Sequence, residues 1–223
     1  VGSVLNGYES ITGQLNVELL EPFRSDKLFV NSYGNHEGRW EVNTHFAKKF
    51  KDDNSTLFLA HASGQEVKVD HNHDGFLDMP LTRQYNILNR WHIQKPNRIE
   101  GQIGGKAMME TRQGGQKNFE YNKDFGDTNY YGIGIDNKQI ELFTKTGFVF
   151  PAKPYKSIAF TTSERYHEQD MYFGLKKYKG KQISVNINGI WQTIISHTDH
   201  KIKFGPSLNY DNYSESFNDS AFK

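Results

Sequence analysis

The chain has 223 residues, a mean hydropathy of -0.76 and 14% aromatic residues. Its 27 basic and 26 acidic residues nearly cancel, so charge gives no reason to expect a nucleic-acid partner. It has no cysteine, which excludes disulfides and thiolate sites, and no apolar run approaches the ~20 residues of a membrane-spanning helix.

In chain order, the first predicted element is a short strand over 15–20. Glu21-Pro22-Phe23 ends this strand before a linker that reaches Lys27. From Lys27 onward the patterns predict strands only, with no long helix and no repeat of fixed period. Nine strands are expected, and they cover 27–34, 39–50, 55–63, 83–94, 98–112, 129–150, 157–173, 183–196 and 201–211.

Several of these strands alternate between apolar and polar residues, which predicts a sheet with two chemically different faces. The clearest is 201–211, where apolar side chains alternate with lysine, serine and asparagine. The strand over 183–196 begins in the same way. In contrast, the strands 27–34, 55–63 and 157–173 are ambiguous by this test.

The predicted connections are of two kinds. Short ones follow the strands that end near Phe50, Gln94, Phe150 and Ser196, and long ones cover 64–82, 113–128 and much of 163–182. The two kinds alternate, except for a short link at 36–38. Short turns at one end of a meander and long loops at the other are typical of outer-membrane barrels.

Three stretches resemble the TonB-dependent outer-membrane receptors common in Bacteroidetes. They are GYESITGQLNVELLEP (7–22), KLFVNSYGNHEGRWEVNTHFAKKF (27–50) and DHNHDGFLDMPLTRQYNILNRW (70–91). The first is similar to the end of the receptor's plug domain, the second to its first barrel hairpin and the third to a long outer loop that enters the fourth strand.

This resemblance implies an all-β, antiparallel, up-and-down transmembrane β-barrel, of which about nine strands of roughly 22 are present as an open curved sheet. Residues 1–25 would be the C-terminal end of the plug with its linker, and 26–223 the N-terminal part of the barrel. The implied location is the outer membrane of a Gram-negative bacterium. The implied function is uptake of a siderophore, metal chelate, cobalamin or glycan, with outer-membrane lipid and, through the missing N-terminal part, the TonB complex as partners.

In such a barrel each face has its own surroundings. The expected lumen-facing polar residues are Arg90, Glu100, Lys106, Glu110 and Arg112. Lipid contact is expected for Ile183, Val185, Ile202, Phe204 and Leu208. An aromatic girdle at the membrane interface is expected from Trp40, Tyr85, Trp91 and Tyr210. Without a membrane, the same residues would be a solvated face and ordinary cross-strand aromatics.

One loop has the spacing of a calcium site. Asp70, Asn72, Asp74 and Asp78 alternate around Gly75 as oxygen ligands do in a calcium loop, but the glutamate at position twelve is absent, where Leu81 stands. A polar outer loop without metal is the alternative. His61, His71 and His73 form either a transition-metal cluster or solvent-facing histidines.

No catalytic motif is present, so an enzyme is not expected and no cofactor other than this calcium is predicted. The alternative from another class is a soluble, calcium-dependent β-sandwich that binds carbohydrate. The two interpretations differ in one respect: a sandwich buries the apolar faces of its strands, whereas a barrel wall exposes them.

Overall fold

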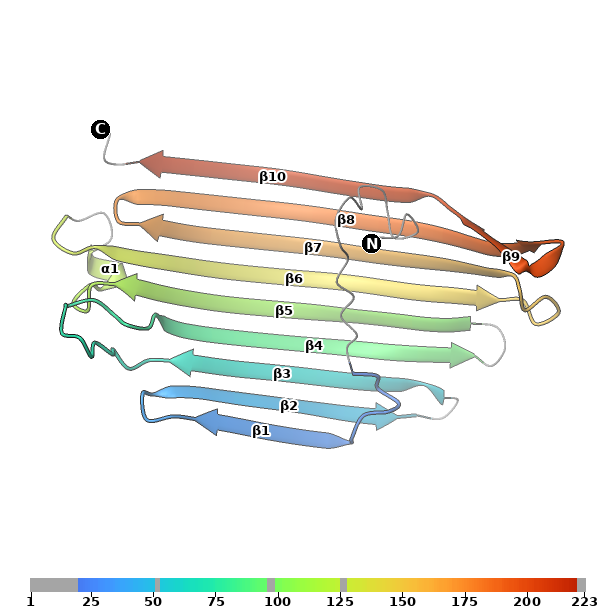
Figure 1. Cartoon of the computed structure of the whole chain (residues 1–223), viewed down its shortest axis with the longest axis horizontal. Coiled ribbons are helices and arrows are strands. Elements are labelled where there is room, and N and C mark those ends of the chain that lie inside the picture. The colour runs from blue at the N-terminus through green and yellow to red at the C-terminus, as the bar shows by residue number, and fades with distance from the viewer. Residues whose placement is uncertain (1–19, 51–52, 96–98, 125–127, 220–223) are drawn as a thin grey trace.

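The computed structural model describes residues 20–50, 53–95, 99–124 and 128–219, and these form one antiparallel sheet (Figure 1). The predicted strand over 15–20 falls outside the described residues, except for Leu20. A single helical turn, α1 (Tyr121–Asp124), lies between β5 and β6. The strands are β1 (Leu28–Gly34), β2 (Arg39–Lys49), β3 (Ser55–Gln65), β4 (Leu81–Lys95), β5 (Ile99–Gly115), β6 (Gly132–Val149), β7 (Ser157–Phe173), β8 (Lys176–Ile195), β9 (His197–Phe204) and β10 (Ser207–Asp219).

Consecutive strands are neighbours throughout the sheet. The order is β1-β2-β3-β4-β5-β6-β7-β8-β10, and β9 also pairs with β8. β1 and β10 lie at opposite edges, so the described strands form an open up-and-down sheet and not a closed barrel. This confirms the predicted all-β class and the open meander, with ten strands where nine were expected.

The tenth strand arises because the predicted strand 201–211 is divided at Gly205-Pro206. β9 and β10 follow each other along β8, and the Gly189 amide donates to the Pro206 carbonyl at 2.9 Å. Gly205 lies so close to β8 that an added Cβ would collide with the Gly189 carbonyl oxygen. Proline has no amide hydrogen to continue the ladder, so the strand breaks at this pair.

The prediction of a long loop across much of 163–182 was wrong. β7 and β8 continue through this region and are joined by a tight turn at Gly174, whose φ is +59°. The sequence is highly charged here, which is typical of loops, but the charges are complementary across the two strands. Glu168 is the register partner of Lys181, and Asp170 that of Lys179. Opposite charges at facing positions stabilise a strand pair.

The long connections that do form, 66–80 and 116–131, lie at the same end of the sheet, on the left in Figure 1. We call this the loop end. The opposite end, where 150–156 joins β6 to β7, is the turn end.

The register separates two faces along the whole sheet. The face that carries Trp91 and Ile103, which are register partners, is the apolar face, and the same row continues to Ile187 and Leu208. These side chains are exposed: Trp91 by 42% and Leu208 by 57%. The opposite, polar face carries amide, hydroxyl and charged side chains, among them Gln84, Asn86, Gln102, Gln139, Ser184 and Asn186.

No second layer covers the apolar face within the described ranges, since every described strand belongs to one sheet. The described residues therefore do not form the two packed sheets of the alternative sandwich. The buried apolar residues are few, and they lie where other segments fold against the sheet: Ala47, Leu57, Val69, Leu88, Phe119 and Tyr172. No helix in the described part of the chain is long and apolar enough to cross a membrane.

Candidate functional site

The predicted lumen-facing residues all lie on the polar face. Arg90 belongs to β4, and Glu100, Lys106, Glu110 and Arg112 lie at alternate positions of β5 in matching register. They are spread along the strands and do not form one cluster. Glu100 is near the turn end and Arg112 near the loop end, so the face is polar along its length.

At the turn end, the segment that precedes β1 packs on this polar face. Arg90 is only 6% exposed, and its guanidinium donates a hydrogen bond to the carbonyl oxygen of Leu20. Phe23 packs on His92 with their ring centroids 5.0 Å apart, and His92 is 3% exposed. We call residues 20–27 the entry segment.

The entry segment is also tied to the edge of the sheet. The amide of Ala47 donates to the carbonyl of Lys27 at 3.0 Å, and Pro22 is fully buried. Ser55 and Leu57 of β3, the register partners of His92 and Arg90, have no exposed surface. This docking was not predicted from the sequence. One signal in the sequence could have indicated it: Leu88 is an apolar residue on the otherwise polar face of the predicted strand 83–94, two positions before Arg90.

A hydrogen-bond network occupies the polar face between β2 and β3. His61 Nδ1 lies 2.6 Å from Asn43 Oδ1, and Asn43 Nδ2 donates to Glu41 at 2.9 Å. His61 Nε2 lies 3.2 Å from the Ser63 hydroxyl. Both ring nitrogens of His61 thus have partners inside the sheet, which separates this residue from the predicted cluster with His71 and His73.

At the loop end, the polar face has a hollow of about 220 Å³ whose walls carry paired charges. Arg112 binds Glu110 through two nitrogens, at 2.6 and 2.8 Å, and Asn137 donates to the other Glu110 oxygen at 3.3 Å. Across the hollow, Arg39 Nη2 lies 3.7 Å from Glu41 Oε2. The hollow therefore offers guanidinium, carboxylate and amide groups to a polar ligand.

The calcium-like loop uses its oxygens to hold its own backbone. Asp74 accepts from the Phe76 amide at 2.8 Å, and Asp78 accepts from the His71 amide at 2.7 Å. Asn72 Nδ2 donates to Asp74 at 2.9 Å, while Asp70 pairs with Lys117 at 3.8 Å. Among the described residues, no three His, Asp or Glu side chains are grouped as metal ligands. Calcium at this loop stays a prediction.

The residues predicted to contact lipid share the apolar face. Ile183 and Val185 lie at alternate positions of β8, Leu208 pairs with Ile187, and Phe204 and Ile202 pair with Trp191 and Thr193. The predicted girdle residues Trp40, Tyr85, Trp91 and Tyr210 lie on the same face. The structure thus brings all nine residues to one surface, while lipid contact itself stays a prediction.

No family model, no curated protein and no solved structure matches the chain.

Proposed function

We propose that this chain is part of the wall of an outer-membrane, TonB-dependent receptor, with its apolar face toward lipid and its polar face toward the lumen. The observation that carries the proposal is the band of exposed apolar side chains that crosses the sheet on one face only. It runs over Trp40–Phe46 in β2, Tyr85–Ile93 in β4, Ile140–Phe148 in β6 and Ile183–Trp191 in β8.

The length of the band supports a membrane. β8 has 20 residues, about twice the ~9–11 that a tilted strand needs to cross a bilayer. Its apolar part, Ile183–Trp191, has the length that a tilted strand needs to cross a bilayer. On the loop side of Ile183, the same face continues with Lys181, Lys179 and Lys177. A change from apolar to charged side chains along one face is expected where a strand leaves the hydrocarbon region.

The band also moves along the strands as it crosses from β2 to β6, and it keeps the same rows from β6 to β8. The row that contains Trp40 in β2 reaches Arg83 in β4, where the band begins only at Tyr85. At its other edge, the band ends at Phe46 in β2, but in β4 it extends past the corresponding Asn89 to Ile93. Strands of a barrel are tilted by ~35–45° from its axis, so a level band crosses their rows, as this band does between β2 and β6.

The entry segment supports a receptor with a plug in preference to a simple pore. It reaches the sheet on the polar face, where Arg90 and His92 hold it, and then turns into β1 at the sheet edge. A domain that precedes β1 would by this route lie against the lumen side. The proposed role is active uptake of a siderophore, metal chelate, cobalamin or glycan, with energy relayed by TonB.

The proposal is tested by deleting the reading frame and measuring the uptake of radiolabelled ligands from these four classes. We expect loss of high-affinity uptake of one ligand, and the same loss after removal of TonB from the wild-type strain. Recovery of the protein in the soluble fraction, or unchanged uptake of all four classes, would contradict the proposal.

A further inference from the structure

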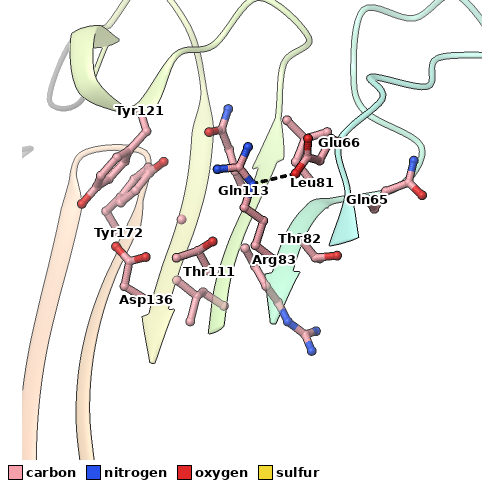
Figure 2. Close-up of a pocket in the computed structure, with 13 residues that line it drawn as sticks. Gln65, Glu66, Leu81, Thr82, Arg83, Thr111, Gln113, Tyr121, Asp136 and Tyr172 are labelled. Atoms are coloured by element: carbon pink, nitrogen blue, oxygen red, sulfur yellow. Dashed lines mark hydrogen bonds and ion pairs between the residues drawn. The ribbon is translucent and has the colours of Figure 1, made fainter. Parts of the chain in front are cut away.

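A second hollow lies at the loop end, on the other side of the sheet from the one between Arg39 and Arg112. It has a volume of about 440 Å³ and lies beyond the apolar band, between the ends of β3 and β7 (Figure 2). Its principal side chains are Glu66, Arg83, Thr111, Gln113, Asp136 and Tyr121. We call it the outer pocket.

One wall of the outer pocket is a stack of aromatic rings. Tyr121 lies on Tyr172 with ring centroids 4.9 Å apart and planes 22° apart, and Figure 2 shows the two rings side by side. Tyr172 is 3% exposed and packs in turn on Phe119 at 5.7 Å. Its ring crosses over Gly134, where an added Cβ would collide with it. The buried Tyr172 therefore holds Tyr121 in place at the pocket.

The floor is a row of polar side chains from neighbouring strands. Arg83, Thr111 and Asp136 are successive register partners on the apolar-face side, so their side chains rise next to one another. The pKa of Asp136 is raised, mainly because it is partly buried and secondarily because Asp170 is near. The floor thus offers a donor, a hydroxyl and an acceptor in one line.

The cationic groups at the pocket already have acidic partners. Arg83 Nε donates to Glu66 at 2.9 Å, and Asp170, beside Asp136, is paired with Lys179 at 3.0 Å. An anionic ligand would have to displace Glu66 and approach Asp136. A neutral ligand with many hydroxyl groups needs neither change, since each hydroxyl both donates and accepts.

We infer that the outer pocket binds a neutral saccharide. The Tyr121 ring supplies an apolar surface for the C–H face of a sugar, and Asp136, Thr111 and Arg83 supply hydrogen bonds to its hydroxyls. Binding pockets of this kind combine an aromatic wall with a few convergent polar groups. The location follows from the proposed function: beyond the lipid-contacting band and outside the barrel, the pocket faces the sugar chains of outer-leaflet lipids.

Titration calorimetry on the protein expressed from its native reading frame tests this inference. The probes are the lipopolysaccharide of the bacterium that encodes it and the polysaccharide released from that lipid by mild acid. We expect binding of both. Tyr121→Ala and Asp136→Asn should each weaken binding of the released polysaccharide about tenfold, equivalent to ~1.4 kcal/mol.

Tyr121→Phe, which keeps the ring, should retain wild-type affinity. Matched changes outside the pocket, Tyr33→Ala and Asp26→Asn, should do the same, since both residues are exposed. Binding of intact lipid only, or unchanged affinity in Tyr121→Ala and Asp136→Asn, would overturn the inference. Saccharide binding by a protein that is absent from the outer membrane would uphold the pocket and contradict the proposed function.

Discussion

Arg90 in β4 donates a hydrogen bond to the carbonyl oxygen of Leu20, which lies 70 positions earlier in the chain. Arg90 is almost fully buried in this contact, together with His92 and Ser55 on the same polar face. The contact fixes the direction from which the chain enters the sheet. It also supplies the physical reason why the fourth strand and the entry segment form one unit.

Replacement of Arg90 by alanine should release the entry segment. The change leaves the Leu20 carbonyl without this donor, at a cost of ~2 kcal/mol, or about thirtyfold in the opening equilibrium. Arg24 is exposed and offers a trypsin site within the segment. Cleavage after Arg24 should therefore be about thirty times faster in Arg90→Ala, since proteolysis follows the population of the open form. The control is Arg39→Ala, an exposed arginine of the same face, which should leave the cleavage rate unchanged.

Gly205→Ala should detach β10 from β8. The new Cβ would collide with the Gly189 carbonyl oxygen, so the two strands must separate locally, and overpacking of this kind costs ~1–3 kcal/mol. Hydrogen exchange at Leu208 and Tyr210 should become faster by a corresponding factor. Gly114→Ala is the matched control, because a Cβ added there would have no other atom within 4 Å, and it should have no effect. Equal protection in both variants would show that the close approach at Gly205 is not a constraint.

Asp136→Asn should increase stability at neutral pH. Because partial burial and Asp170 raise the pKa of Asp136, the folded state binds more protons than the unfolded state between the two pKa values. Stability contributed by this group is thus present at low pH and is lost as the pH rises through the folded pKa. Melting temperatures measured from about pH 3 to 7 should show the gain of Asp136→Asn near pH 7 and none below the ordinary aspartate pKa of ~3.9. A gain of equal size at every pH would contradict this explanation.

Glu164 interrupts the apolar band in β7, between Leu142 of β6 and Val185 of β8. If this face contacts lipid, Glu164→Leu should stabilise the protein in vesicles by up to ~2 kcal/mol, since a carboxylate on the lipid face is unfavourable. The urea midpoint of unfolding in lipid vesicles measures the change. The control is Glu168→Leu. Glu168 lies beyond the band and forms an ion pair with Lys181 at 3.4 Å, so its replacement should give no such gain. A lower midpoint for Glu164→Leu would indicate that water surrounds this face.

The sequence allowed prediction of the two-faced meander because alternation is a local property of each strand. The charged hairpin Glu168–Lys181 was misjudged because its stability comes from pairs across strands, which no single strand displays. The docking of Leu20 on Arg90 and the stack of Tyr121 on Tyr172 also join distant positions. The polar row Glu100 to Arg112 was predictable as a face, but the grouping of Glu110 and Arg112 with Arg39 depends on register and loop packing.

The most direct test of the proposed function uses the absence of cysteine from the chain. Single cysteines at 183, 184, 185, 186 and 187 of β8 carry a nitroxide label, and the protein is placed in lipid bilayers. Relaxation by oxygen, which dissolves in lipid, and by a water-soluble nickel complex is then measured at each position. We predict that labels at Ile183, Val185 and Ile187 respond to oxygen, and that labels at Ser184 and Asn186 respond less to it and more to nickel. Equal access of the nickel complex to all five labels would contradict a lipid-facing apolar band.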